Sequence, residues 1–146
     1  ASNKDAKKIS DLRRETLKNV NREYSKLQIN TWIDIESPEN ILKNINKKDV
    51  FCLVDNNILF GSIDIEDNKI GGLFVKSDNI KRGYGKMLMN FVENFAKKKG
   101  FRKVWLYSTP YAEDFYKRLG YSLVDKGVWV LRGVKFPEIK MEKELV

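Results

Sequence analysis

The segment from residue 70 to residue 100 constrains the fold more than any other part of the chain. Within it, the apolar run Leu73-Phe74-Val75 predicts a buried strand, and a polar turn with Gly83-Tyr84-Gly85 follows. Apolar residues then recur at helical spacing: Met87, Leu88, Phe91, Val92, Phe95 and Ala96. This order predicts an anion site, because glycines let the backbone approach a ligand and the first helical N–H groups are free. Arg82 and Lys86 would add side-chain charge at the same place.

Length and composition predict one globular domain over residues 1–146, with 42% apolar residues to form its core. The chain has no run of about 18 apolar residues and no secretory signal before its first predicted helix, so we expect a cytoplasmic protein with no membrane partner. Histidine is absent and Cys52 is the single cysteine, which disfavours a metal site and a serine–histidine–aspartate triad. Proton transfer would therefore use carboxylates, tyrosine, lysine or water.

The net charge of +8 has two interpretations, a lysine-rich solvated surface or a site for a polyanion such as nucleic acid. The basic residues are spread along the chain and form neither an arginine-rich tail nor a stripe with interleaved aromatic residues. We therefore expect a solvated surface and no nucleic-acid partner.

Three helices are predicted before the first strand, over residues 2–20, over 24–33 and from Ser37-Pro38 through Ile45. Strands at 50–54, 58–66 and 73–75 are separated by tight turns, which predicts an antiparallel meander. The helix over 83–99 then crosses to a strand at 104–107, and this crossover allows the flanking strands to be parallel.

The last third of the chain begins with a helix that Thr109-Pro110 opens and Gly120 ends. Strands are predicted at 121–124 and 139–145, and residues 127–137 between them form either a hairpin or an ordered loop. We find neither an internal repeat nor a linker that would divide the chain.

Two motifs carry a resemblance to a known family. Gly83-Tyr84-Gly85 after a buried strand, followed by Ala112-x-x-Phe115-Tyr116-x-x-Leu119-Gly120-Tyr121, resembles the two main signatures of the GNAT superfamily of acyl-CoA N-acyltransferases. Residues 24–32, 108–121 and 132–134 look like one group of small bacterial members, and 140–145 is similar to the last strand of many. The resemblance covers nearly the whole chain and implies an α+β fold. Its three α/β/α layers would hold a mixed, mostly antiparallel central sheet between helices.

The chain departs from the family pattern in two places. The glycine motif usually begins with Gln or Arg three residues before its first glycine, and here that position is Ile80. Backbone amides can still hold a pyrophosphate without that side chain. The family's first strand would precede Ala1, so either the chain is trimmed or the sheet begins one strand short.

The resemblance implies an N-acetyltransferase that moves an acetyl group from acetyl-CoA to a primary amine by direct attack in a ternary complex. The cosubstrate would lie between the strand ending at Val75 and the strand ending at Ser108, with the pantetheine arm paired to the backbone of Leu73, Phe74 and Val75. One N–H of that strand would also face the thioester oxygen. The pyrophosphate would be held by Lys81, Arg82, Gly83, Tyr84, Gly85 and Lys86. From the residues alone, the first three are core and the last six are a solvated basic turn.

Tyr116 is the implied catalytic residue, the general acid that protonates or solvates the CoA thiolate. Ala112 lies one helical turn earlier and would let the cosubstrate approach, while Phe115 belongs to the same implied cofactor surface. Spacing alone would make Tyr116 an amphipathic tyrosine at the edge of the core.

The base that deprotonates the amine is less well defined. The glutamate that some relatives carry corresponds roughly to Lys69, which cannot serve as a base, and the nearby Asp64 and Glu66 are candidates, directly or through water. We favour the other interpretation of Asp64 and Glu66, in which they belong to an exposed strand face.

For the acceptor we hypothesise a cationic amine attracted by acidic side chains, with Asp34 and Glu36 in the loop that covers the acceptor site in this fold and Asp64 in the meander. Trp32 and Trp129 would line the acceptor pocket, and core packing is an equally good interpretation of Trp32.

Two other function classes stay open. One is a GNAT-fold module that binds CoA without turnover, as a sensor or scaffold, which Ile80 favours and the Phe115-Tyr116 pair opposes. The other is a basic nucleic-acid binder. A homodimer is a further expectation from the resemblance, because many members dimerise, although the sequence shows no interface.

Overall fold

The structure is a computed structural model, and it describes residues 1–19, 24–76 and 83–146. Its helical elements, with η for short three-ten helices, are η1 (Asn3–Asp5), α1 (Ala6–Asn19), α2 (Lys26–Ile35), α3 (Pro38–Lys47), α4 (Tyr84–Lys98), η3 (Pro110–Ala112) and α5 (Glu113–Arg118). Its strands are β1 (Asp49–Asp55), β2 (Ile58–Glu66), β3 (Lys69–Ile70), β4 (Phe74–Val75), β5 (Lys103–Ser108), β6 (Ser122–Leu131) and β7 (Val134–Glu144).

One seven-stranded sheet runs through the molecule in the order β1-β2-β3-β5-β7-β6, and β4 pairs with β2 beside this path. The pairing of β3 with β5 is parallel, as the crossover helix allows, and the other pairings are antiparallel. The predicted meander and the predicted mixed, mostly antiparallel sheet are therefore both confirmed.

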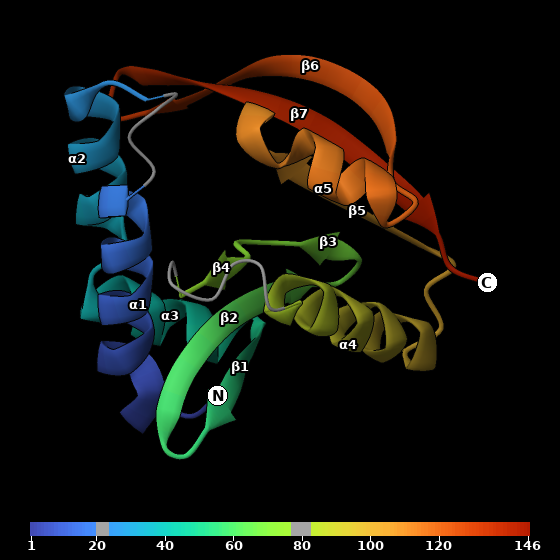
Figure 1. Ribbon diagram of the computed structural model, residues 1–146, viewed down its shortest axis with the longest axis horizontal. Coiled ribbons are helices and arrows are strands. Elements are labelled where there is room, and N and C mark those ends of the chain that lie inside the picture. The colour runs from blue at the N-terminus through green and yellow to red at the C-terminus, as the bar shows by residue number, and fades with distance from the viewer. Residues whose placement is uncertain (20–23, 77–82) are drawn as a thin grey trace.

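The strand expected around residue 74 is interrupted. β3 pairs with both β2 and β5, whereas β4, three residues later, pairs with β2. The pairing with β5 ends at Ile70 and Leu106, so the sheet separates beyond this point. Figure 1 shows the consequence: β1 to β4 lie with α1, α3 and α4 in one half, and β5 to β7 lie with α5 in the other, while α2 reaches the turn end of β6 and β7.

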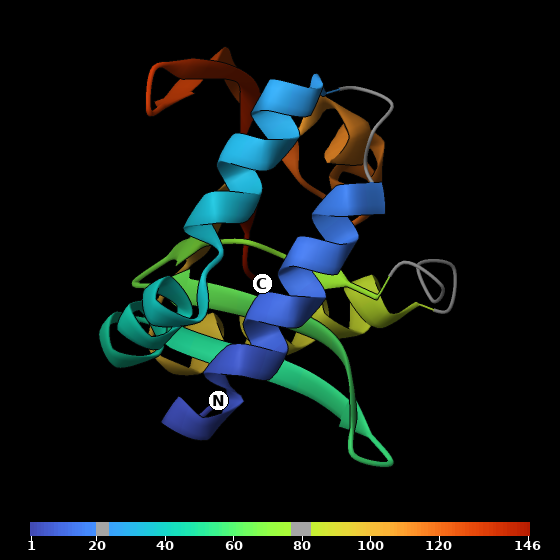
Figure 2. The ribbon, with the colours of Figure 1, turned by 90° about the vertical axis from the view of Figure 1, so that its left-hand side faces the viewer.

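Helices cover both faces of the sheet and give the predicted three layers. On one face, α4 and α5 pack over β2, β5 and β7 around a buried core that includes Ile63, Val92, Leu106, Tyr116 and Met141. On the other face, α1 and α3 pack on β1 through Ile9, Ile41 and Val50. Figure 2 shows α1 and α2 side by side across that second face.

Local sequence signals explain where the helices begin. Ser25 and Ser37 cap α2 and α3, because their hydroxyls accept the N–H groups of Gln28 and Asn40 at 3.1 and 3.2 Å. Gly83 precedes α4 with φ of +79°, a left-handed conformation that glycine adopts without strain. None of the described helices has the length and apolar character needed to span a membrane.

The C-terminal strands extend further than the sequence predicts. β6 and β7 form a long hairpin that turns at Arg132-Gly133, where both residues have positive φ. The hairpin alternative for residues 127–137 is therefore correct. The length of β6 was not evident from the sequence, because most of this strand is exposed and lacks a buried face that alternates with a polar one.

Candidate functional site

The gap between β4 and β5 leaves one edge of β4 without a strand partner in the described chain. Its other edge pairs with β2 through Phe74 and Val75. The Phe74 side chain is buried, and those of Leu73 and Val75 pack against the main core. The side chains of this predicted cofactor segment are thus core, and what it offers a ligand is the hydrogen-bonding backbone edge of β4.

The N-terminus of α4 adjoins the same gap. The first hydrogen bond of this helix runs from the Met87 N–H to the Gly83 carbonyl at 3.0 Å, so the N–H groups of Tyr84, Gly85 and Lys86 have no acceptor inside the helix. Lys86 is exposed. The predictions at Ile80, Lys81 and Arg82 lie outside the described residues.

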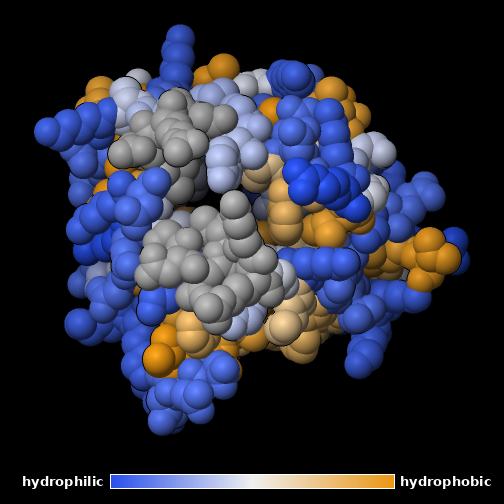
Figure 3. Space-filling view, viewed as in Figure 1, coloured by the Kyte–Doolittle hydropathy of each residue, from blue (hydrophilic) through white to orange (hydrophobic). Residues whose placement is uncertain are grey.

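Three predicted cofactor residues from different elements meet beside this terminus. A Cβ added to Gly85 of α4 would lie 3.2 Å from the Phe115 ring of α5 and 3.8 Å from Val75 of β4. Glycine at 85 therefore permits the close approach of α4 and α5. Figure 3, viewed as in Figure 1, shows hydrophobic side chains, in orange, that reach the surface on this side of the molecule.

Ser108 and Ala112 lie where β5 passes into α5. Ser108 is buried, and its hydroxyl donates to the Thr109 carbonyl at 2.7 Å. The Thr109 hydroxyl in turn accepts the Ala112 N–H at 3.3 Å and caps the short helix η3. Ala112 is half-buried against the main core, close to Phe115 in the chain.

Tyr116 is buried on the inner side of α5, in edge-on contact with the rings of Phe115 and Tyr121. Its hydroxyl has no hydrogen-bond partner within the described residues, so an O–H donor is available to a ligand. Burial raises the pKa of Tyr116 well above its ordinary value. This side chain therefore keeps its proton at neutral and moderately alkaline pH.

A polar network that the sequence did not predict holds Tyr121, whose ring contacts that of Tyr116. The Tyr121 hydroxyl donates to Oε2 of Glu93 in α4 at 2.8 Å, and Nζ of Lys143 in β7 donates to Oε1 of the same carboxylate at 2.8 Å. Burial and the Glu93 charge raise the pKa of Tyr121. This network links α4 to the half of the sheet formed by β5, β6 and β7.

Glu36 and Asp64, two of the three predicted acidic acceptor residues, meet at one buried arginine. Arg13 of α1 donates to Glu36 Oε2 at 3.2 Å, to Asp64 Oδ2 at 3.3 Å and to the Ser62 hydroxyl at 3.3 Å. The exposed strand face predicted for Asp64 is wrong, because Asp64 is 3% exposed and lies under α1. Asp34 is separate from this cluster, and its carboxylate lies 3.7 Å from Arg132 in the β6–β7 turn.

Asp64 also keeps one oxygen without a hydrogen bond. Oδ1 is fully buried and has no hydrogen-bond partner in the described chain, and the Lys48 ammonium lies 3.9 Å from it. This oxygen lies 1.7 Å from the position that a Cβ on Gly71 would occupy. The carboxylate therefore fills the space of a missing side chain at the point where β3 ends.

The two predicted acceptor tryptophans come together in an aromatic cluster. The Trp32 ring of α2 contacts Trp129 of β6 at a centroid distance of 6.2 Å, and it also contacts Phe74 and Phe136. Both tryptophans are half-buried. Trp32 thus packs among aromatic rings, and its role in lining an acceptor pocket stays a prediction.

Sequence reasoning missed Arg13, although a signal was present. Arg13 follows Ile9 by one helical turn and therefore lies on the apolar face of α1, where a charged residue needs a buried partner. It also missed a group on β3, β5 and β7, in which the lysines of residues 69 and 140 lie over the Trp105 ring. No local pattern brings these three together, because they come from distant parts of the chain.

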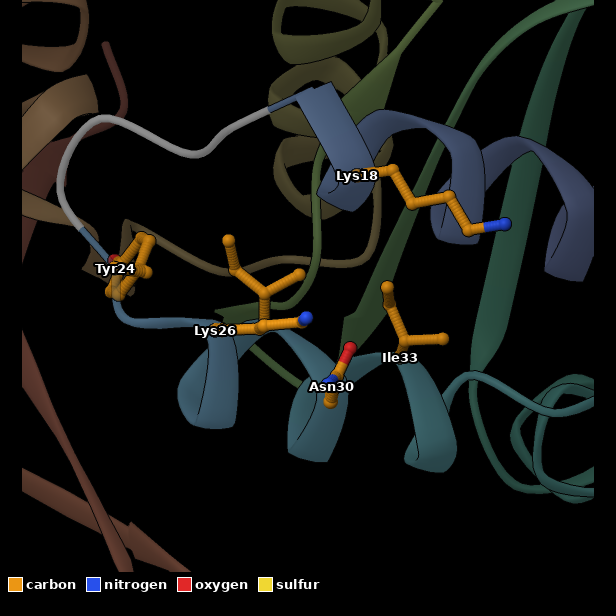
Figure 4. A pocket seen from close by; sticks show the side chains of 6 residues that line it. Lys18, Tyr24, Lys26, Asn30 and Ile33 are labelled. Carbon is orange, nitrogen blue, oxygen red and sulfur yellow. The ribbon is translucent and has the colours of Figure 1, made fainter.

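A shallow pocket lies between the end of α1 and α2. It has a volume of about 390 Å³ and is lined by Lys18, Tyr24, Lys26, Ile29, Asn30 and Ile33 (Figure 4). None of the residues predicted to bind the cosubstrate lines it. Within the described chain, no three histidine, cysteine, aspartate or glutamate side chains gather as a metal site would require.

The comparisons with known proteins agree on one family. The family model described as an acetyltransferase (GNAT) domain matches residues 20–145. No curated protein matches the chain at the required significance.

Solved structures give the same fold. A GCN5-related N-acetyltransferase from Rhodopseudomonas palustris superposes with a TM-score of 0.94 at 17% identity, covering 99% of this chain and 92% of that one. The PaiA N-acetyltransferase from Thermoplasma acidophilum, solved with coenzyme A, gives 0.82 at 24% identity, covering 99% and 95%. An aminoglycoside 6'-N-acetyltransferase, also solved with coenzyme A, gives 0.69 at 21% identity, covering 97% and 91%.

Proposed function

The chain belongs to the GNAT acetyltransferase family, and from this premise we propose that it transfers the acetyl group of acetyl-CoA to a primary amine. The observation that carries the proposal is Tyr116, a buried phenol that keeps its proton and has no hydrogen-bond partner within the described residues. The family match over residues 20–145 supports acetyl transfer in general, and the two solved neighbours with coenzyme A support the cosubstrate.

The residues present fit this cosubstrate. The first N–H groups of α4, at Tyr84, Gly85 and Lys86, suit a pyrophosphate, since a helix N-terminus favours negative charge. The edge of β4 without a strand partner in the described chain suits the amides of a pantetheine arm in the manner of an added strand. On this part of the chain, the Thr16 hydroxyl donates to the Val75 carbonyl at 3.5 Å. Gly85, Phe115, Ala112 and Ser108 complete the surface that we assign to it. When bound, acetyl-CoA supplies an activated thioester carbonyl with a thiolate leaving group.

We assign to Tyr116 the role of hydrogen-bond donor to the leaving sulfur. An ordinary thiol has a pKa of about 8.5, so a phenol whose pKa burial has raised does not transfer its proton completely to the thiolate. It can nevertheless stabilise the negative charge on sulfur through a charge-assisted O–H hydrogen bond. The general acid of the sequence hypothesis thus becomes, in this proposal, a donor that solvates the thiolate.

The amine nitrogen loses one proton as its bond to the acetyl carbon forms and the carbon–sulfur bond breaks. Asp64 is an unfavourable base, because its Oδ2 already accepts a hydrogen bond from Arg13 and its side chain is buried under α1. Glu66 is half-buried with Lys47 3.9 Å away. We therefore propose that water near the gap between β4 and β5 accepts the proton that the amine nitrogen loses.

The test measures release of free thiol from acetyl-CoA with a panel of primary amines, together with the mass of the acetylated product. We expect turnover by the wild type and a fall in kcat of about a hundredfold in Tyr116→Phe, with KM for acetyl-CoA unchanged. The control is Tyr111→Phe, which removes an exposed hydroxyl from the preceding three-ten helix η3. Full turnover by Tyr116→Phe would remove the role of Tyr116. Binding of acetyl-CoA without thiol release from any amine would favour the sensor or scaffold function instead.

A further inference from the structure

Two lysines share one indole ring on the sheet face opposite α4 and α5. Nζ of Lys69 lies 5.2 Å from the centroid of the Trp105 ring, and Nζ of Lys140 lies 4.7 Å from it. Lys69 is also 5.2 Å from the ring of Tyr107, which is 44% exposed. The neighbouring residues Ile70 and Leu106 point into the main core, so alternation along the strands places these side chains on the other face.

Neither ammonium group has an ion-pair partner in the described part of the chain, whereas the three acidic residues predicted for the acceptor site do. Glu36 and Asp64 are paired with Arg13, and Asp34 is paired with Arg132. The charge of Lys69 acts on the carboxyl group of Glu138. Burial raises the pKa of Glu138, and the Lys69 charge opposes this effect. Two like charges held over one ring repel each other, and a bound anion would remove this repulsion.

The position of the lysine pair relates it to the gap in the sheet. Lys69 is directly opposite Trp105, one residue before the pairing of β3 and β5 ends, and Lys140 is opposite Tyr107. At about 3.3 Å per residue, the pair lies roughly 3 to 7 Å from the start of the gap. A small molecule could thus contact the lysines at one end and reach the gap with the other.

We infer that the acceptor is a small primary amine with an anionic group, carboxylate or phosphate, which binds between Lys69 and Lys140 over Trp105. This inference rests on the proposed acetyl transfer, since that transfer places the amine in the gap. The spacing calls for an anionic group about four bonds from the nitrogen, at about 1.5 Å per bond. It replaces the cationic acceptor that the acidic residues of the sequence suggested, because Asp34, Glu36 and Asp64 already have Arg132, Arg13 and Lys48 beside them.

The experiment compares four amines of similar size: 4-aminobutyrate, 2-aminoethyl phosphate, the neutral 4-aminobutanamide and the cationic 1,4-diaminobutane. Each is titrated by calorimetry into the protein with coenzyme A present. We expect the two anionic amines to bind at least about tenfold more tightly than the neutral amide, as charge-assisted hydrogen bonds predict. The better of the two anionic probes distinguishes carboxylate from phosphate.

Substitutions of the two lysines test whether the anionic group binds between them. Lys69→Gln and Lys140→Gln should each weaken binding of the anionic amines about tenfold and leave the neutral amide unchanged. The matched control is Lys103→Gln, on the same sheet face and strand as Trp105, because Lys103 is already paired with Glu142. Equal binding of the four amines, preference for the diamine, or equal effects of all three substitutions would overturn the inference.

Measuring thiol release with the same amines distinguishes a failure of this inference from a failure of the proposed function. If anionic amines bind through Lys69 and Lys140 but no thiol is released, the anion site stands and the acetyl transfer fails. If thiol is released equally with the amide and the diamine, and the lysine variants change nothing, the transfer stands and the anion site fails.

Discussion

At the scale of single residues, the Asp64 carboxylate occupies the space that a side chain at residue 71 would need. A Cβ at residue 71 would lie 1.7 Å from Asp64 Oδ1, so Gly71→Ala must displace a carboxylate that Arg13 holds from the other side. Because a displaced buried carboxylate loses its partner, we expect the free energy of unfolding to fall by about 3 kcal/mol. Urea denaturation measures this loss.

Gly127→Ala is the matched control for this substitution. A Cβ at residue 127 has no atom within 4 Å, and its φ lies outside the left-handed region. We expect Gly127→Ala to change the free energy of unfolding by less than about 0.5 kcal/mol. Equal stability of the two alanine variants would show that Asp64 does not occupy the space beside Gly71.

At the scale of elements, Arg13 joins α1 to the end of α2 and to β2. Its guanidinium contacts Glu36, Ser62 and Asp64, and it lies 4.9 Å from the centroid of the Phe74 ring in β4. Arg13→Met keeps most of the volume and leaves two buried carboxylates without their principal cation. We expect a loss of about 4 kcal/mol in the free energy of unfolding, measured by urea denaturation.

The control for Arg13→Met is Lys7→Met, which breaks an exposed pair with Asp11 on the same helix. That change should cost less than about 0.5 kcal/mol, as for other surface pairs. A similar small loss in Arg13→Met would mean that water, and not Arg13, compensates the charges of Glu36 and Asp64.

Local sequence signals predicted where the helices begin, and they predicted the site only in part. Ser37-Pro38, Gly83 and Thr109-Pro110 mark helix starts through chemistry confined to a few residues, so their positions were predicted correctly. The break between β3 and β4 was missed because the apolar run at 73–75 continues the pattern of a strand, while its pairing depends on β5.

The electrostatics of the site were predicted less well, for a physical reason. Asp34, Glu36 and Asp64 look like free acidic residues in the sequence, but Arg13 and Arg132 pair with them from positions 23 to 98 residues away. Such pairs depend on tertiary packing, which periodicity does not encode. Tyr116 was identified through the family motif, and its role stays a prediction.

At the scale of the whole molecule, two buried phenols link the halves on either side of the gap. Tyr116 and Tyr121 are in ring contact, and Tyr121 donates to Glu93 of α4. Burial is the main cause that raises the pKa of each above the ordinary value of 10.0. Above that pH the unfolded chain releases protons that the folded protein retains, so the free energy of unfolding must fall as pH rises.

We expect this fall to begin near pH 10, with each tyrosine contributing up to about 1.4 kcal/mol per pH unit. Urea denaturation between about pH 9 and about pH 11 should show a shallower slope for Tyr116→Phe and for Tyr121→Phe than for the wild type. Tyr111→Phe, which alters an exposed ring, should keep the wild-type slope. An unchanged slope in both buried variants would mean that these phenols ionise within the folded protein, and the proton that we assign to Tyr116 during acetyl transfer would then be lost in the same pH range.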